Sequence, residues 1–180
     1  MQNQSLAAIA VALWGIGVVL YLMLATLVTL RLLTTRNDAA GLGPSYWIYM
    51  GATAITVLAG SRILVLPADL PIMVATSAVV SGLTFVLWAF GVWWVPLLVI
   101  FGVWRHGIRR VPLRYENGLW SIVFPLGMYS VASMHFGAET HLPLVATLGE
   151  IGTWISGAAW LAVAVAMVAS FSQRRLPVSG

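Results

Sequence analysis

Long apolar segments, separated by short polar or basic stretches, make up most of this chain. A helix needs about 20 mainly apolar residues to cross a bilayer, and five segments reach or approach that length: 6–30, 45–66, 72–104, 119–136 and 144–171. The third is too long for one straight span and too short for two. We expect one helix there, kinked near Gly91 and Pro96 and projecting beyond the bilayer. The pattern predicts an all-α membrane protein, with five transmembrane helices in a single integral membrane domain, residues 1–180.

The composition supports this class, because 61% of the residues are hydrophobic, 8% are charged and the mean hydropathy is +0.96. Soluble domains are about 25% charged. The absence of cysteine excludes disulfides, thiolate zinc sites and iron–sulfur clusters. The small basic excess, nine arginines against five acids, lies beside the apolar segments, which is typical of membrane topology and not of nucleic-acid binding. The expected partner is therefore the lipid bilayer.

Arginine also predicts the orientation, since loops rich in arginine stay in the cytoplasm. Arginines follow the first apolar segment, occupy the connection 105–114 and end the fifth segment: Arg31, Arg36, Arg105, Arg109, Arg110, Arg114, Arg174 and Arg175. The connections 67–71 and 137–143 contain none. Connections with arginine and connections without arginine therefore alternate along the five helices. They predict a multi-pass cell-membrane protein with its N-terminus outside and its C-terminus in the cytoplasm.

The second apolar segment carries a polar stripe. Small or hydroxyl-bearing residues recur along it at helical spacing: Tyr46, Tyr49, Thr53, Thr56 and Gly60. Such a face either lines a water-filled path or packs against a neighbouring helix through small residues. Arg62 lies near the outer end of this helix, where it either extends to the lipid headgroups or attracts an incoming anion. Asp69, in the next connection, is an alternative partner that would neutralise its charge.

The fourth segment, within 118–137, contains residues that loosen a helix or form hydrogen bonds. Pro125, Gly127 and three serines would be unusual in a helix that only contacts lipid. Helical spacing gathers one set within a sector of about 100°: Ser121, Phe124, Pro125, Met128, Ala132 and His135. Pro125 removes a backbone hydrogen bond, and a carbonyl freed at membrane depth needs protein, water or substrate as its partner. The face predicts either a pore lining or a kinked packing helix.

Catalysis has no support in the sequence. The chain contains no Walker motif, no H-E-x-x-H and no Ser-His-Asp arrangement, so we expect no enzyme activity and no cofactor. His135, His141 and Glu139 leave a metal site geometrically open, but nothing further favours one. No carboxylate lies in mid-membrane, which favours a channel or uniporter over a proton-driven carrier.

Several stretches carry a family resemblance. The most specific are 109–115 (RRVPLRY) and 119–129 (LWSIVFPLGMY), and the stretches 88–97 (WAFGVWWVPL) and 50–56 (MGATAIT) support them. In these the chain resembles the tellurite-resistance/C4-dicarboxylate transporter (TDT) family, which includes TehA-like bacterial permeases and plant slow-type anion channels. All five predicted helices can be placed on that family, so the resemblance covers nearly the whole chain.

This resemblance implies a fold of ten helices in five hairpins, commonly trimeric, with the odd-numbered helices around a pore in each protomer. The chain looks like helices six to ten, so its second and fourth helices would line the pore. The family's pore is closed by a phenylalanine on the ninth helix, and Phe124 matches it by motif. The front five helices have no counterpart here. The resemblance therefore implies a fragment, a half that pairs with a separately encoded half, or a self-associating chain, for instance a homotrimer.

Two functions remain open at this point. The first is a subunit of a permease for small anions, such as halide, nitrate, C4-dicarboxylate or related oxyanions, with Phe124 as gate. The second is a non-transporting membrane interaction protein, such as a truncated remnant that associates with a full-length permease.

Overall fold

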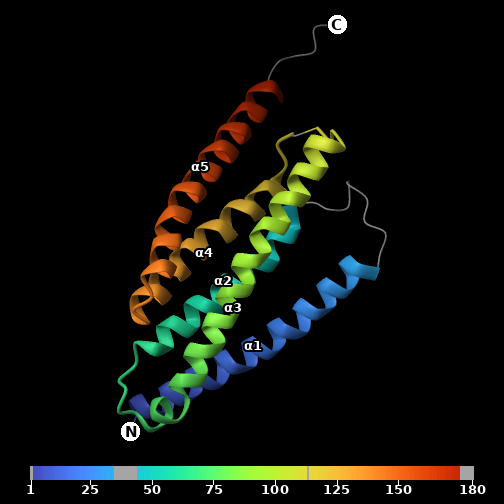
Figure 1. The fold of residues 1–180 in the computed structure, drawn as a ribbon. Coiled ribbons are helices and arrows are strands. Elements are labelled where there is room, and N and C mark those ends of the chain that lie inside the picture. Colours follow the sequence, from blue (N-terminus) through green and yellow to red (C-terminus); the bar gives the residue numbers. More distant parts are fainter. Residues whose placement is uncertain (1, 35–43, 113, 175–180) are drawn as a thin grey trace, which may run out of the picture.

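A computed structural model describes residues 2–34, 44–112 and 114–174. It contains five long helices: α1 (Gln2–Thr34), α2 (Trp47–Leu64), α3 (Pro71–Val103), α4 (Trp120–Glu139) and α5 (Pro143–Arg174). Three short turns join or precede them: η1 (Pro44–Tyr46), the π-helical η2 (Trp104–Ile108) and η3 (Asn117–Leu119). All five helices are long and apolar enough to cross a membrane. The predicted all-α membrane fold is confirmed (Figure 1).

The helix bounds differ from the apolar segments mainly at the two ends of the chain. Helix α1 begins at Gln2 and ends at Thr34, and α5 ends at Arg174, because polar residues that flank an apolar run can continue a helix beyond the lipid. Pro96 lies inside α3, which continues as one helix into the π-helical turn. The third segment is therefore a single long span, as expected.

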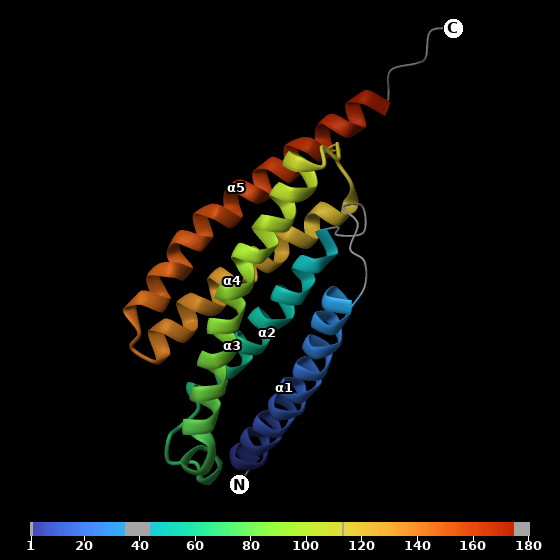
Figure 2. The same ribbon diagram turned by 45° about the vertical axis from the view of Figure 1, so that its right-hand side comes forward.

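Neighbouring helices alternate in direction along the chain (Figures 1 and 2). The C-terminal ends of α1, α3 and α5 lie at the same end of the molecule as the N-terminal ends of α2 and α4. The described arginines other than Arg62 belong to this end, which we call the basic end. Arg36 and Arg175 fall outside the described residues. The separation of arginine between the two ends agrees with the charge pattern that predicts the topology.

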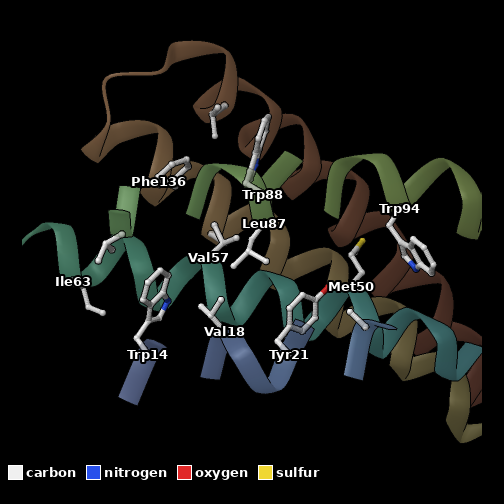
Figure 3. Packing of buried hydrophobic residues seen from close by; sticks show 14 of the residues in the cluster. Trp14, Val18, Tyr21, Met50, Val57, Ile63, Leu87, Trp88, Trp94 and Phe136 are labelled. Carbon is white, nitrogen blue, oxygen red and sulfur yellow. The ribbon is translucent and has the colours of Figure 1, made fainter. Parts of the chain in front are cut away.

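Helix α2 lies at the centre of the packing and contacts α1, α3 and α4, whereas α5 packs on α4. The core is built from apolar and aromatic side chains, and Figure 3 shows Val18 of α1, Val57 of α2 and Leu87 of α3 directed toward one another. Two indole N–H groups join helices within it. Trp14 Nε1 donates to the carbonyl oxygen of Thr56 at 2.9 Å, and Trp88 Nε1 donates to Ser133 Oγ at 2.9 Å. Such bonds matter in a bilayer because lipid offers no partner to a buried polar group.

Small residues allow the closest helix contacts. A Cβ added to Gly149 of α5 would lie 2.7 Å from the backbone nitrogen of Met134 in α4. A Cβ added to Gly152 would lie 2.6 Å from Ser130 Oγ. These two glycines lie in the contact that holds α5 on α4, so they allow the two helices to approach closely.

Candidate functional site

Helices α2 and α4 each carry a strip of side chains that the other described helices leave at least partly uncovered. The two strips have the same spacing of 4, 3, 4 and 3 residues, so each follows one face of its helix. The α2 strip consists of Ile48, Ala52, Ile55, Ala59 and Arg62, and the α4 strip consists of Phe124, Met128, Val131, His135 and Ala138. Both helices run in the same direction from the basic end (Figure 1). Arg62 Nη2 lies 3.2 Å from His135 Nε2, so the strips adjoin at the far end.

Phe124 lies within the α4 strip and is 56% exposed. Met128 and His135 share this face and are half-buried, while Ser121 is half-buried at its edge. Pro125 and Ala132 are buried. A Cβ at Gly51 of α2 would lie 3.1 Å from Pro125 Cγ, so this proline packs into the α2–α4 contact. The predicted face of α4 is therefore divided between an uncovered strip and a packing edge.

The polar stripe predicted on α2 is mostly enclosed by α1 and α3. Thr53 is fully buried and its hydroxyl is hydrogen-bonded to the Tyr21 hydroxyl of α1. Tyr49 is buried beside aromatic rings, with its ring centroid 4.7 Å from that of Trp94. Tyr49 and Thr53 are therefore buried in contacts between helices, as the packing interpretation of this stripe predicts.

Gly60 and Thr56 continue the stripe toward the far end of α2. Gly60 is buried so closely against α3 that an added Cβ would overlap Thr84 Oγ1. Thr56 is half-buried, and its hydroxyl donates to the carbonyl oxygen of Ala52 at 2.8 Å. The Thr56 hydroxyl is thus occupied within its own helix, and Gly60 serves close packing.

Arg62 and His135 form the polar end of the two strips. Arginine has only donors, so Arg62 Nη2 donates and His135 Nε2 accepts. The imidazole is therefore neutral in this arrangement, with its proton on Nδ1. Asp69 is exposed in the α2–α3 connection and does not form an ion pair with Arg62. An ion pair of the described residues, Arg105–Glu116, lies at the basic end. The neighbour of Arg62 across the α2–α4 contact is thus a histidine and not a carboxylate.

A cavity of about 340 Å³ adjoins the α2 strip at the basic end. Its walls come from α1, η1 and α2: Leu24, Val28, Arg31, Tyr46, Ile48, Tyr49 and Ala52. Ile48 and Ala52 belong to both the cavity and the strip. The strip therefore runs from a cavity bordered by one arginine to a second arginine at the opposite end.

Comparison with known proteins assigns the chain to a family. The sequence profile described as voltage-dependent anion channel (SLAC1) matches residues 1–168. The chain belongs to the voltage-dependent anion channel family. This assignment confirms the resemblance to the TDT family that the motifs around Phe124 indicate.

Relatives of the chain are described as membrane proteins or as a transporter. The chain is 49% identical over 149 residues to uncharacterized membrane proteins of two Mycobacterium tuberculosis strains, CDC 1551 and H37Rv, covering 83% of this chain and 75% of each relative. It is 27% identical over 122 residues to an uncharacterized transporter of Methanocaldococcus jannaschii, covering 68% of this chain and 34% of that protein. No solved structure matches the chain. The family and the transporter relative together support a membrane anion transporter.

In this anion channel family member, sequence reasoning selected three residues of the α4 strip, without Val131 and Ala138, and one residue of the α2 strip, Arg62. Phe124, Met128 and His135 were found by motif and spacing. Ile48, Ala52, Ile55 and Ala59 were missed because they are apolar and look like any lipid-facing residues. The available signal was their 4, 3, 4, 3 spacing, which ends on Arg62. Among the described residues, no three histidine or acidic side chains come together as a group that could hold a metal ion.

Proposed function

We propose that this chain is a subunit of a permease or channel for small anions, in which the α2 and α4 strips line part of a central pore. The observation that carries the proposal is the pair of adjoining strips. They occupy two helices of an anion channel family member and contain no acid, and the α2 strip ends on Arg62, which contacts His135 of the α4 strip. An uncovered face with a cation and no carboxylate suits an anion better than a cation.

Conduction along these strips would be passive. The strips offer apolar side chains between the two ends and no carboxylate at mid-depth, so no acidic group that could carry a proton lies midway along them. Arg62 would attract the anion, and the energy of dehydrating it along the apolar section would select among halide, nitrate, C4-dicarboxylate and related oxyanions. Phe124 would act as the steric gate because its ring projects from the uncovered face of α4.

The pore requires further helices. We infer that α2 and α4 correspond to two inner helices of the family fold and that α1, α3 and α5 are peripheral. The exposed apolar side chains of α1 and α5 support this arrangement because lipid covers such surfaces at no cost. The remaining inner helices would come from a front half, on the same or on a separately encoded chain, or from further copies of this chain, with a homotrimer as one arrangement.

Flux through reconstituted protein tests the proposal. We expect nitrate and chloride flux from proteoliposomes that contain this chain together with a five-helix front half of a ten-helix family member. The chain reconstituted by itself is the matched control, and flux in that sample would indicate self-assembly. A stable complex with the front half that conducts neither anion would overturn the permease and favour the non-transporting interaction protein.

The proposed orientation places the basic end in the cytoplasm and the N-terminus outside. The chain contains no cysteine, so single cysteines report position without background. Ala68 lies exposed in the α2–α3 connection, and Asn117 lies exposed at the basic end in η3. On intact cells a membrane-impermeant maleimide should label Ala68→Cys and leave Asn117→Cys unlabelled until the cells are lysed. The reverse labelling would contradict the proposed orientation.

A further inference from the structure

We propose that Arg62 and His135 form an anion-binding site in which a small monovalent anion binds together with one proton. The site lies where the α2 and α4 strips meet, at the end opposite to the basic end. Its position at a pore mouth rests on the proposed function. The binding chemistry itself rests on the two side chains and their contact.

The contact between Arg62 and His135 is a hydrogen bond that needs a neutral imidazole. The guanidinium donates through Nη2 to Nε2 of the imidazole at 3.2 Å. This hydrogen bond requires a lone pair on Nε2, and only the neutral imidazole with its proton on Nδ1 supplies one. In this arrangement a neutral His135 occupies one donor of Arg62.

Protonation of His135 would reverse these roles. Both ring nitrogens of an imidazolium are donors, so the hydrogen bond from Arg62 is lost. Two cations would then lie at hydrogen-bond distance, and like charges at such a separation repel. A small anion between them accepts one hydrogen bond from the guanidinium and one from Nε2–H. Two charge-assisted hydrogen bonds thus replace the one that was lost. Anion and proton therefore favour each other at this site.

The carboxylates closest to the pair along the chain are Asp69, in the connection after α2, and Glu139, one helical turn after His135. Helix α3 (Pro71–Val103), which packs beside α4, contains no titratable side chain. The titratable groups at this end are Asp69, Glu139, His141 and Glu150, and all four are exposed. Among the described residues, none of these carboxylates forms an ion pair with Arg62 or His135. The charge on the pair is thus left for a diffusible anion.

Thermodynamic linkage gives the measurable consequence. If an anion raises the affinity for a proton, the proton raises the affinity for the anion by the same factor. Where one proton is taken up per anion, the dissociation constant rises by about tenfold for each unit of pH. The proton comes from solution when the anion binds and returns when it leaves, so the site releases no net proton over one cycle of binding and dissociation.

The test uses the full chain in nanodiscs with nitrate as the probe. We would measure the nitrate-dependent rise in thermal unfolding midpoint at about pH 5.5 and about pH 8, a range across which histidine side chains change charge. Ionic strength is held constant with a large organic anion. A ligand that binds only the folded protein raises the midpoint according to its concentration relative to its dissociation constant. The dissociation constant for nitrate should be at least about tenfold smaller at the lower pH, as proton linkage requires.

Three variants define the site. His135→Gln keeps an acceptor for Arg62 but cannot be protonated, so binding should stay at its weak, high-pH value at both pH values. Arg62→Gln should weaken binding at both. The matched control is His141→Asn, at the same end of the molecule, where φ of His141 is 55° and asparagine tolerates that conformation. This control should keep the pH dependence of the native chain.

The outcomes separate this site from the permease. Nitrate binding that depends equally on pH in His135→Gln and in the native chain would overturn the site, as would the absence of nitrate binding at both pH values. Flux without proton-linked binding would overturn the site and leave the permease standing. Proton-linked binding without flux in any assembly would support the site and overturn the permease.

Discussion

Replacing Phe124 with alanine should raise anion flux through the assembled protein by about tenfold, which corresponds to a barrier lower by about 1.4 kcal/mol. The ring projects from the uncovered face of α4 and is 56% exposed, so its removal leaves an open section along the strip. Among the described residues, Phe124 does not belong to the cluster of buried hydrophobic side chains that forms the core. The expected effect is therefore on conduction and not on folding. Stopped-flow or fluorescence-quench measurements of nitrate flux in proteoliposomes would record it.

The matched control for this change is Phe171→Ala. Phe171 is also 56% exposed, but it lies on the peripheral helix α5. It should leave flux unchanged, and Phe124→Leu, which keeps most of the apolar volume, should raise flux much less than Phe124→Ala. Equal flux from Phe124→Ala and the native assembly would remove Phe124 as the gate.

The fold could be predicted from the sequence because the bilayer imposes its own length scale. Runs of about 20 apolar residues have few alternatives to a spanning helix, and five such runs became five helices. Helix ends were harder to predict. The polar residues of 2–5 and 172–174 continue α1 and α5 although they add nothing to the apolar pattern.

The candidate site was only partly predictable. A stripe such as Tyr49, Thr53 and Gly60 has the same residue types whether it lines water or packs, because hydroxyls and glycines serve both purposes. In the structure Tyr21 and Thr84 lie against this stripe. Periodicity defines the face of α2 that carries the stripe. It does not say whether that face turns toward neighbouring helices or toward a pore.

The pairing of Arg62 with His135 shows the same limit more sharply. The two residues are 73 positions apart and belong to helices that are not consecutive. Each could be placed separately near the end of a helix from the sequence. Their contact depends on how α2 and α4 pack on each other, which is a tertiary feature.

A leucine at Gly149 should disrupt the contact between α4 and α5. A Cβ there would lie 2.7 Å from the Met134 backbone nitrogen and 2.8 Å from the Ser130 carbonyl oxygen. These are backbone atoms of a helix, so they cannot move aside as a flexible side chain would. Overpacking of this kind costs about 3 kcal/mol at the upper end of its usual range. Because α5 packs on α4, we expect Gly149→Leu to weaken this contact and to lower the thermal unfolding midpoint.

Gly157→Leu provides the control on the same helix. A Cβ at Gly157 meets nothing within 4 Å, so the added side chain would lie in lipid, and leucine is the better helix former by about 0.8 kcal/mol. The two substitutions change helix propensity equally and differ only in what they meet. Gly157→Leu should therefore unfold at or above the native midpoint in nanodiscs while Gly149→Leu unfolds below it. Equal midpoints for the two variants would mean that α5 is held to α4 by something other than the close contact at Gly149.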